Sequence, residues 1–233
     1  MTTSSPTPTT ARWDAYEPGL AGRTVRACLE PIQRGYVSND EPWAVARLAQ
    51  LRRGAGKAPE EVPELFGLID MDALYTPEGR VRGSEHGPTA IHLAVTLYAL
   101  HQQSQRASRM HVIGPQLGGA VRALMPQGEI DEPLRRRFVR AAGATSANVL
   151  AYRLRELILL LRRAGEPLDY GRLADQIERI LDPTRRLAVR REWGRDFHSW
   201  RPRKDAEGVH PTNEGGSPAT GHDSEDTREP YGR

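Results

Sequence analysis

The chain has 233 residues, of which 27% are charged and 6% are aromatic, and its formal net charge is +3. It contains no run of about 18 apolar residues, and its N-terminus lacks the charged start and apolar stretch of a secretory signal, so we expect a cytoplasmic protein that does not enter a membrane. A single cysteine, Cys28, excludes an intrachain disulfide and a thiolate zinc knuckle, and we expect it to be a small buried hydrophobic residue.

Leu, Ala and Arg are frequent and Phe is rare, which favours helix over sheet. Helical patterns bounded by Gly, Pro or capping residues predict helices over Pro18–Gln33, Asp40–Arg53, Thr89–Gln103, Leu117–Met125, Asp131–Ala142, Thr145–Arg163, Tyr170–Leu181 and Thr184–Trp200. Asp40 is the predicted cap of the second helix. The Gly- and Pro-rich stretch from Gly54 to Pro88 predicts short helical turns linked by loops.

The predicted fold class is all-α, with about eight to ten helices arranged as two small bundles. A break near Gly128 divides an N-terminal helical lobe over 11–127 from a basic C-terminal helical bundle over 128–200, and the polar ends at 1–10 and 201–233 are predicted to be disordered. The helix over Thr89–Gln103 is apolar on most of its circumference, so it should be buried on several sides. The apolar run Leu157–Leu161 must be covered by neighbouring helices or by a second copy of the chain.

Residue types that serve catalysis do not form a recognised constellation. Asp70 and Asp72 are a close acidic pair that a metal-dependent nuclease would need, but no third acid is near them and helix capping is the favoured interpretation. Ser84 and His86 lack the elbow motif of a nucleophilic serine, and no two histidines form the helical zinc motif. Gly54–Lys57 lacks the spacing of a phosphate loop and predicts a turn. We therefore expect no enzymatic activity, no metal and no cofactor.

Basic charge is concentrated in one part of the chain. Leu134–Arg195 holds fifteen Arg and seven acids, whereas Arg201–Arg233 holds five basic and seven acidic residues. An excess of guanidinium groups on a helical body predicts a polyanionic partner.

Within this region, Arg136 and Arg140 lie opposite the apolar strip of Leu134 and Phe138 on a helical projection. No acid occurs between Leu134 and Leu154, so we expect this stripe to lack i,i+4 carboxylate partners. Aromatic residues do not alternate with the basic clusters, which favours phosphate contacts over base stacking. The alternatives are a solvated helix face, or a helical interaction adaptor whose basic faces dock acidic proteins.

Several segments occur in an order that resembles a known family: Ala49–Arg53, Leu93–Gln103, Leu134–Arg140, Glu166–Ala174 and Arg191–Phe197. Together they are similar to the CasB family, the small subunit of the type I-E CRISPR complex Cascade. The segment between Gly54 and Pro88 and the C-terminal tail are longer than in shorter relatives, and no site is predicted in the tail.

This resemblance implies a non-enzymatic protein that holds nucleic-acid backbone and stabilises the R-loop of guide RNA and target DNA. The implied partners are other Cascade subunits, guide RNA, the target and displaced DNA strands, and a second copy of the chain. The positions that match basic contacts of the family are Arg52, Arg53, Arg136, Arg137, Arg140, Arg153, Arg185 and Arg186, and Arg106 and Arg109 lie in a loop that is also basic in relatives.

Overall fold

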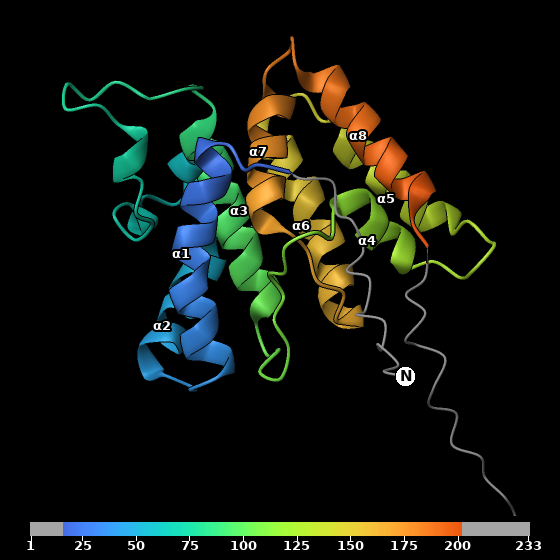
Figure 1. Cartoon of the computed structure of the whole chain (residues 1–233), viewed down its shortest axis with the longest axis horizontal. Helices are drawn as coiled ribbons and strands as arrows, with labels where there is room; N and C mark the ends of the chain where they lie inside the picture. Colours follow the sequence, from blue (N-terminus) through green and yellow to red (C-terminus); the bar gives the residue numbers. More distant parts are fainter. Residues whose placement is uncertain (1–15, 202–233) are drawn as a thin grey trace, which may run out of the picture. The chain divides into compact units, whose positions relative to one another are not determined.

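A computed structural model describes residues 16–201, and within this range it contains α- and 3₁₀-helices but no β-strand (Figure 1). The α-helices are α1 (Leu20–Val37), α2 (Pro42–Leu51), α3 (Gly87–Gln102), α4 (Leu117–Ala123), α5 (Glu132–Gly143), α6 (Ala147–Ala164), α7 (Tyr170–Leu181) and α8 (Arg186–Ser199). The all-α prediction is confirmed. The predicted disordered ends lie outside the described residues, apart from Arg201. No helix in the described part of the chain is long and apolar enough to cross a membrane.

The stretch between α2 and α3 contains short helical turns, as predicted. They are the 3₁₀-helices η1 (Arg52–Gly54), η2 (Pro59–Glu61), η3 (Pro63–Leu65) and η4 (Asp72–Leu74). Lys57 N donates to Gly54 O at 3.0 Å, so Gly54–Lys57 forms the expected turn. Proline residues begin η2 and η3, where the missing N–H costs no helical hydrogen bond.

Side-chain caps explain where two of the later helices begin, while one predicted cap is wrong. Asp131 accepts a hydrogen bond from Leu134 N at 2.9 Å and Asp169 accepts one from Arg172 N at 3.0 Å. Asp40 does not cap α2, because Glu41 occupies the N-cap position. Asp40 instead adopts a left-handed conformation with φ 48° and forms an ion pair with Arg106.

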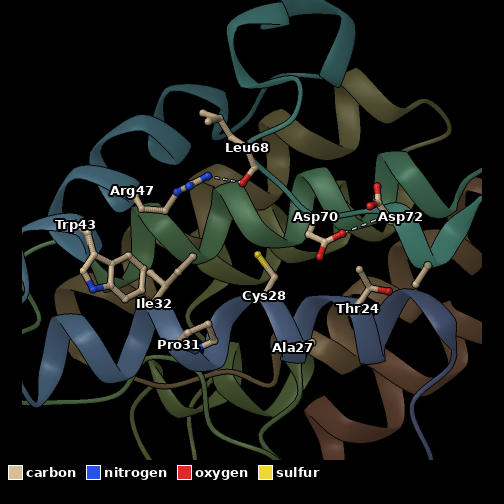
Figure 2. A pocket seen from close by; sticks show the side chains of 11 residues that line it. Thr24, Ala27, Cys28, Pro31, Ile32, Trp43, Arg47, Leu68, Asp70 and Asp72 are labelled. Atoms are coloured by element: carbon tan, nitrogen blue, oxygen red, sulfur yellow. Dashed lines mark hydrogen bonds between the residues drawn. The ribbon is translucent and has the colours of Figure 1, made fainter.

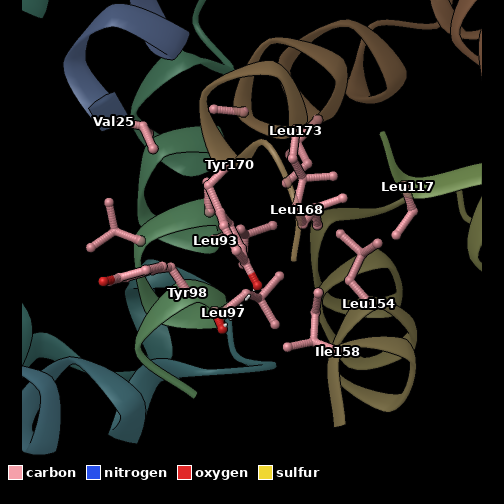
Figure 3. Packing of buried hydrophobic residues seen from close by; sticks show 14 of the residues in the cluster. Val25, Leu93, Leu97, Tyr98, Leu117, Leu154, Ile158, Leu168, Tyr170 and Leu173 are labelled. Carbon is pink, nitrogen blue, oxygen red and sulfur yellow. Dashed lines mark hydrogen bonds between the residues drawn. The ribbon is translucent and has the colours of Figure 1, made fainter. Parts of the chain in front are cut away.

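Helix α3 is the centre of the core. Its residues from Ala90 to Gln102 are all buried, and it packs against α1, α2, α6 and α7. In Figure 3, Leu93 and Leu97 of α3 point toward Leu154 and Ile158 of α6, with Tyr170 of α7 between them. Each fully buried leucine of this kind stabilises the fold by about 1.5–3 kcal/mol. The expectation of a helix buried on several sides is confirmed.

Two glycines allow α1 and α7 to approach closely. A Cβ atom on Gly22 would lie 2.8 Å from Gly171 O, and one on Gly171 would lie 3.0 Å from Gly22 O. Buried Asp175 of α7 then accepts hydrogen bonds from Gly19 N and Gly22 N, both at 2.7 Å. Its carboxylate thus caps the N-terminus of α1, where it also interacts favourably with the helix dipole.

A second close approach joins α4 to α8. A Cβ atom on Gly118 would lie 2.3 Å from Trp193 O, so only glycine fits here without movement of the backbone. Phe138 of α5 stacks on Phe197 of α8 with ring centroids 5.4 Å apart. Together these contacts hold α4, α5 and α8 as one packed layer.

The apolar run in α6 is covered mainly by its own chain. Leu157, Ile158 and Leu161 are fully buried, and Leu159 and Leu160 pack partly buried against the core. The buried cluster extends through α1, α3, α6 and α7 and so crosses the predicted boundary at 127/128. The division into two lobes stays a prediction.

Candidate nucleic-acid interface

Helix α6 lies beside several of the predicted basic clusters. Near its middle, Arg155 packs against the turn after η1, because a Cβ atom on Gly56 would lie 2.4 Å from Arg155 Cδ. Seven residues later, Arg162 Nε donates to Gln103 O at 2.9 Å, in the loop that follows α3. Residues seven apart share one face of a helix and lie about 10 Å apart along its axis. The 52–57 and 103–109 segments therefore lie along the same side of α6.

Arg52 and Arg53 begin the first of these segments. Both are exposed, and neither forms an ion pair with a residue between 16 and 201. Exposed Lys57 follows in the same turn. With Arg155 packed against Gly56, four basic residues from two parts of the chain lie in or beside this turn. Arg155 is not among the positions predicted from the resemblance, since its proximity to Gly56 requires the tertiary fold.

Arg106 and Arg109 lie in the second segment, and they differ in their surroundings. Arg106 forms an ion pair with Asp40, and its guanidinium group lies 5.0 Å from the centre of the Tyr36 ring. Arg109 is exposed and has no ion-pair partner in the described range. Arg109 is therefore available to a ligand, while Arg106 must first exchange a carboxylate partner.

A buried amide holds this loop in place. Gln102 Nε2 donates to Gln105 O at 2.5 Å and to Ser108 O at 2.9 Å, while Gln102 Oε1 accepts from Met110 N at 3.0 Å. Gln33 of α1 fixes the end of the loop, since its Oε1 accepts from His111 N at 2.9 Å. The loop is thus anchored by side chains whose role the sequence pattern did not reveal.

The arginine stripe on α5 has a carboxylate partner that the sequence argument overlooked. Glu132 accepts from Arg135 Nε at 2.6 Å and from Arg136 Nε at 3.2 Å. These hydrogen bonds lower the pKa of exposed Glu132 to about 2. The expectation that the stripe lacks i,i+4 partners is wrong for Arg136, because Glu132 lies just before the stretch without acids.

Arg137 and Arg140 complete the stripe and are exposed, with no ion-pair partner among residues 16–201. Arg137 lines a cavity of about 390 Å³ together with Arg163 of α6. Arg163 directly follows Arg162, which contacts the 103–109 loop. The α5 stripe therefore adjoins the same end of α6 as that loop.

Arg153 is half-buried and is engaged within α6. Its Nη1 donates to Glu156 Oε2 at 3.0 Å, and its guanidinium group lies 5.2 Å from the centre of the Tyr152 ring. Tyr152 is 53% exposed, so one aromatic ring lies beside Arg153 on the surface. Like Arg155, this ring lies on the outer face of α6.

Arg185 and Arg186 begin α8 and have different roles. Arg186 Nε donates to Ile180 O at 2.8 Å, and its Nη2 reaches Leu181 O at 3.3 Å and Thr145 O at 3.4 Å. These bonds satisfy the carbonyl groups that end α7 and link α8 to the start of α6. Arg185 is exposed and forms no ion pair with the described residues.

The described residues contain no group of three or more His, Cys, Asp or Glu side chains that could hold a metal ion. Asp70 Oδ1 accepts from Asp72 N at 3.1 Å and thereby shapes the turn that leads into η4. Ser84 Oγ accepts from His86 N at 3.2 Å, in a turn before α3. These contacts are of the kind that shapes local turns.

Comparisons with known proteins agree with this description. A profile of the CRISPR-associated protein Cse2 family matches residues 47–198. The crystal structure of CasB from Thermobifida fusca is 48% identical, and the match covers 78% of this chain and 100% of that chain with a TM-score of 0.70. No curated protein matches.

Two more distant structures share the fold. A Cse2-family protein from Thermus thermophilus is 23% identical, with coverage of 77% and 97% and a TM-score of 0.55. A chain of a CRISPR RNA-guided surveillance complex is 24% identical, with coverage of 76% and 93% and a TM-score of 0.57. The resemblance found in the sequence is confirmed, and the chain belongs to the Cse2 (CasB) family of CRISPR-associated proteins.

Proposed function

We propose that this protein is a non-catalytic, cytoplasmic subunit of a type I-E CRISPR surveillance complex, in which it holds nucleic acid by the phosphate backbone. The fold match to a chain of an RNA-guided surveillance complex supports the assembly. The partners in this proposal are other Cascade subunits, guide RNA, target and displaced DNA, and a second copy of the chain.

The observation that carries the nucleic-acid role is the placement of basic segments along α6. The turn containing Arg52, Arg53 and Lys57 lies at Arg155, and the loop containing Arg109 lies at Arg162. A row of cationic groups spaced along one helix suits a repeating phosphate backbone, which needs charge at intervals rather than a single pocket. Exposed Tyr152 adds a ring on which one base can stack.

The predicted contact residues fall into three groups by their present partners. Those without an ion-pair partner in the described range are the first contacts we propose: Arg52, Arg53, Arg109, Arg137, Arg140 and Arg185. Arg106, Arg136 and Arg153 would exchange a carboxylate for a phosphate. Arg186 already donates to backbone carbonyls, and we propose for it a supporting role.

R-loop stabilisation requires that the protein bind the opened strands better than the closed duplex. Only such differential affinity shifts the equilibrium between the two states. A surface that follows one flexible backbone past a stacking ring favours single strands over duplex DNA. We therefore propose that single-stranded DNA or RNA is the preferred ligand of the α6 surface.

The test compares two variants with the same loss of charge. Arg52→Ala/Arg53→Ala/Arg155→Ala removes three cations from the α6 surface, and Arg23→Ala/Arg34→Ala/Arg80→Ala removes three exposed cations from α1 and the 75–82 loop. Binding of labelled single-stranded DNA, single-stranded RNA and duplex DNA is measured across a salt series. Each lost phosphate contact should make the slope of log K against log salt shallower by about 0.7 for single strands.

We expect weaker binding and a shallower slope for the α6 variant only. Equal effects in both variants would indicate attraction by net charge without a defined surface. Wild-type binding that does not depend on salt or on nucleic-acid length would instead favour the alternative, an adaptor that docks acidic proteins.

A further inference from the structure

A pocket of about 430 Å³ lies between α1, α2 and the segment from Leu68 to Ala73 (Figure 2). It is lined by none of the arginines proposed above to contact nucleic acid. Its size falls within the range of sites that take a small molecule or a side chain of a partner.

The pocket has a fixed apolar wall. Pro31 and Ile32 of α1 line it from one side, and Trp43 of α2, which is 48% exposed, lines it from another. The Trp43 Nε1 hydrogen donates to the Glu41 carboxylate, which also accepts from Asn39 Nδ2 at 2.8 Å. This pair of hydrogen bonds orients the indole ring before any partner arrives, so less conformational entropy is lost on binding.

The polar groups of the pocket are mainly acceptors. Asp70 and Asp72 line it, and neither carboxylate forms an ion pair with a residue of the described range. Arg47 lines the same pocket, but its Nη1 donates to Leu68 O at 2.6 Å. This cation is therefore hydrogen-bonded to another residue of the pocket wall. Burial raises the pKa of Cys28 to about 11, which keeps its thiol neutral near neutral pH.

One side of the pocket comes from an acidic segment of the chain. From Pro59 to Glu85 the chain has seven acids and two arginines, in contrast to the arginine-rich region from Leu134 to Arg195. The carboxylates of Asp70 and Asp72, unpaired within the described range, repel phosphate groups and attract a cationic protein side chain.

We propose that this pocket binds a lysine or arginine side chain of a neighbouring protein subunit, with its head group at Asp70 and Asp72 and its aliphatic stem along Trp43 and Ile32. The stem then covers apolar surface while the charge stays at the rim, beside the two carboxylates. This inference rests on the proposed role as a subunit of a larger complex. It assigns the pocket to protein contacts and leaves the basic residues along α6 for nucleic acid.

The first experiment measures incorporation of the labelled protein into a complex of the other subunits that lacks it. Asp70→Asn/Asp72→Asn removes two charges from the pocket while keeping an acceptor at position 70 for the Asp72 amide. The control, Glu60→Gln/Glu64→Gln, removes two exposed charges from the same acidic stretch outside the pocket. We expect about tenfold weaker incorporation of the pocket variant and less than a twofold change for the control.

The second experiment uses Cys28, the only cysteine, as a reporter within the pocket. We expect N-ethylmaleimide, followed by peptide mass spectrometry, to modify Cys28 at least tenfold more slowly in the complex than in the isolated protein. An unchanged rate would overturn the inference. Protection that grows with the concentration of the isolated protein would also overturn it, because it would assign the pocket to a second copy of this chain.

These outcomes are separable from failure of the proposed function. If the wild-type protein does not bind the other subunits, both proposals fail. If the Asn variant incorporates as well as wild type, or if both variants weaken equally, only the pocket assignment fails. Binding of the isolated Asn variant to single-stranded DNA is measured in parallel and should stay within twofold of wild type.

Discussion

Replacing Gln102 by Leu should release the loop that carries Arg106 and Arg109. The substitution keeps a side chain of similar size but removes the amide that bonds Gln105 O, Ser108 O and Met110 N. At about 1 kcal/mol for each hydrogen bond, closure of the loop should lose about 3 kcal/mol. Since about 1.4 kcal/mol corresponds to a factor of ten, the loop should open about 100-fold more often.

Hydrogen exchange at the Met110 amide measures this opening directly. This amide belongs to a buried residue and donates to Gln102, so it exchanges only when the loop opens. We expect its exchange to accelerate about 100-fold in Gln102→Leu, and not in the control Gln50→Leu, which changes an exposed glutamine of α2. Amide protection within about threefold of wild type would show that Gln102 does not hold the loop.

Gln102→Leu also tests whether this loop contributes to nucleic-acid binding. If the loop contributes phosphate contacts, Gln102→Leu should weaken single-strand binding by no more than Arg106→Ala/Arg109→Ala does, and combining all three changes should add little. Such non-additivity is expected of residues that act through one structural unit. A fully additive loss of affinity would mean that Gln102 affects nucleic-acid binding through a part of the protein other than this loop.

Two further predictions concern stability. Gly118→Ala should destabilise the protein by about 1–3 kcal/mol, because the new Cβ would lie 2.3 Å from Trp193 O. In the control Gly143→Ala the new Cβ meets no atom within 4 Å, so the free energy of unfolding should change by less than about 1 kcal/mol. Equal destabilisation of the two variants in urea unfolding would refute the close approach of α4 and α8. Burial lowers the pKa of His101 to about 4, below the ordinary value of 6.5. The unfolded state therefore binds the proton more readily than the folded state. The contribution of His101 to stability is full above about pH 6.5 and is lost as the pH falls toward 4. We expect a loss of about 2 kcal/mol from this group between about pH 7 and about pH 5, and a smaller loss in His101→Gln; an equal pH dependence in both proteins would contradict a buried neutral imidazole.

Helix positions were largely predictable from local signals. The prediction for Tyr170–Leu181 matches α7 at both ends, because Asp169 supplies a cap and Pro183 follows the last turn. The helix predicted from Asp131 to Ala142 differs from α5 by one residue at each end, and Asp131 is its cap. Asp40 was misassigned, since its carboxylate has a competing partner, Arg106, far away in the chain. Local propensity cannot include such a contact.

The sequence by itself also determined the helical class, the excess of positive charge and the family, because composition, periodicity and the order of motifs are properties of the chain alone. Which arginines are available was decided by the tertiary structure. Arg106 pairs with Asp40, Arg186 reaches Thr145 O before α6, and Arg155 reaches the turn at Gly56. A guanidinium group without a carboxylate partner can bind phosphate directly, whereas a paired one must first exchange its partner. Partners that are distant in the sequence are brought to it by packing.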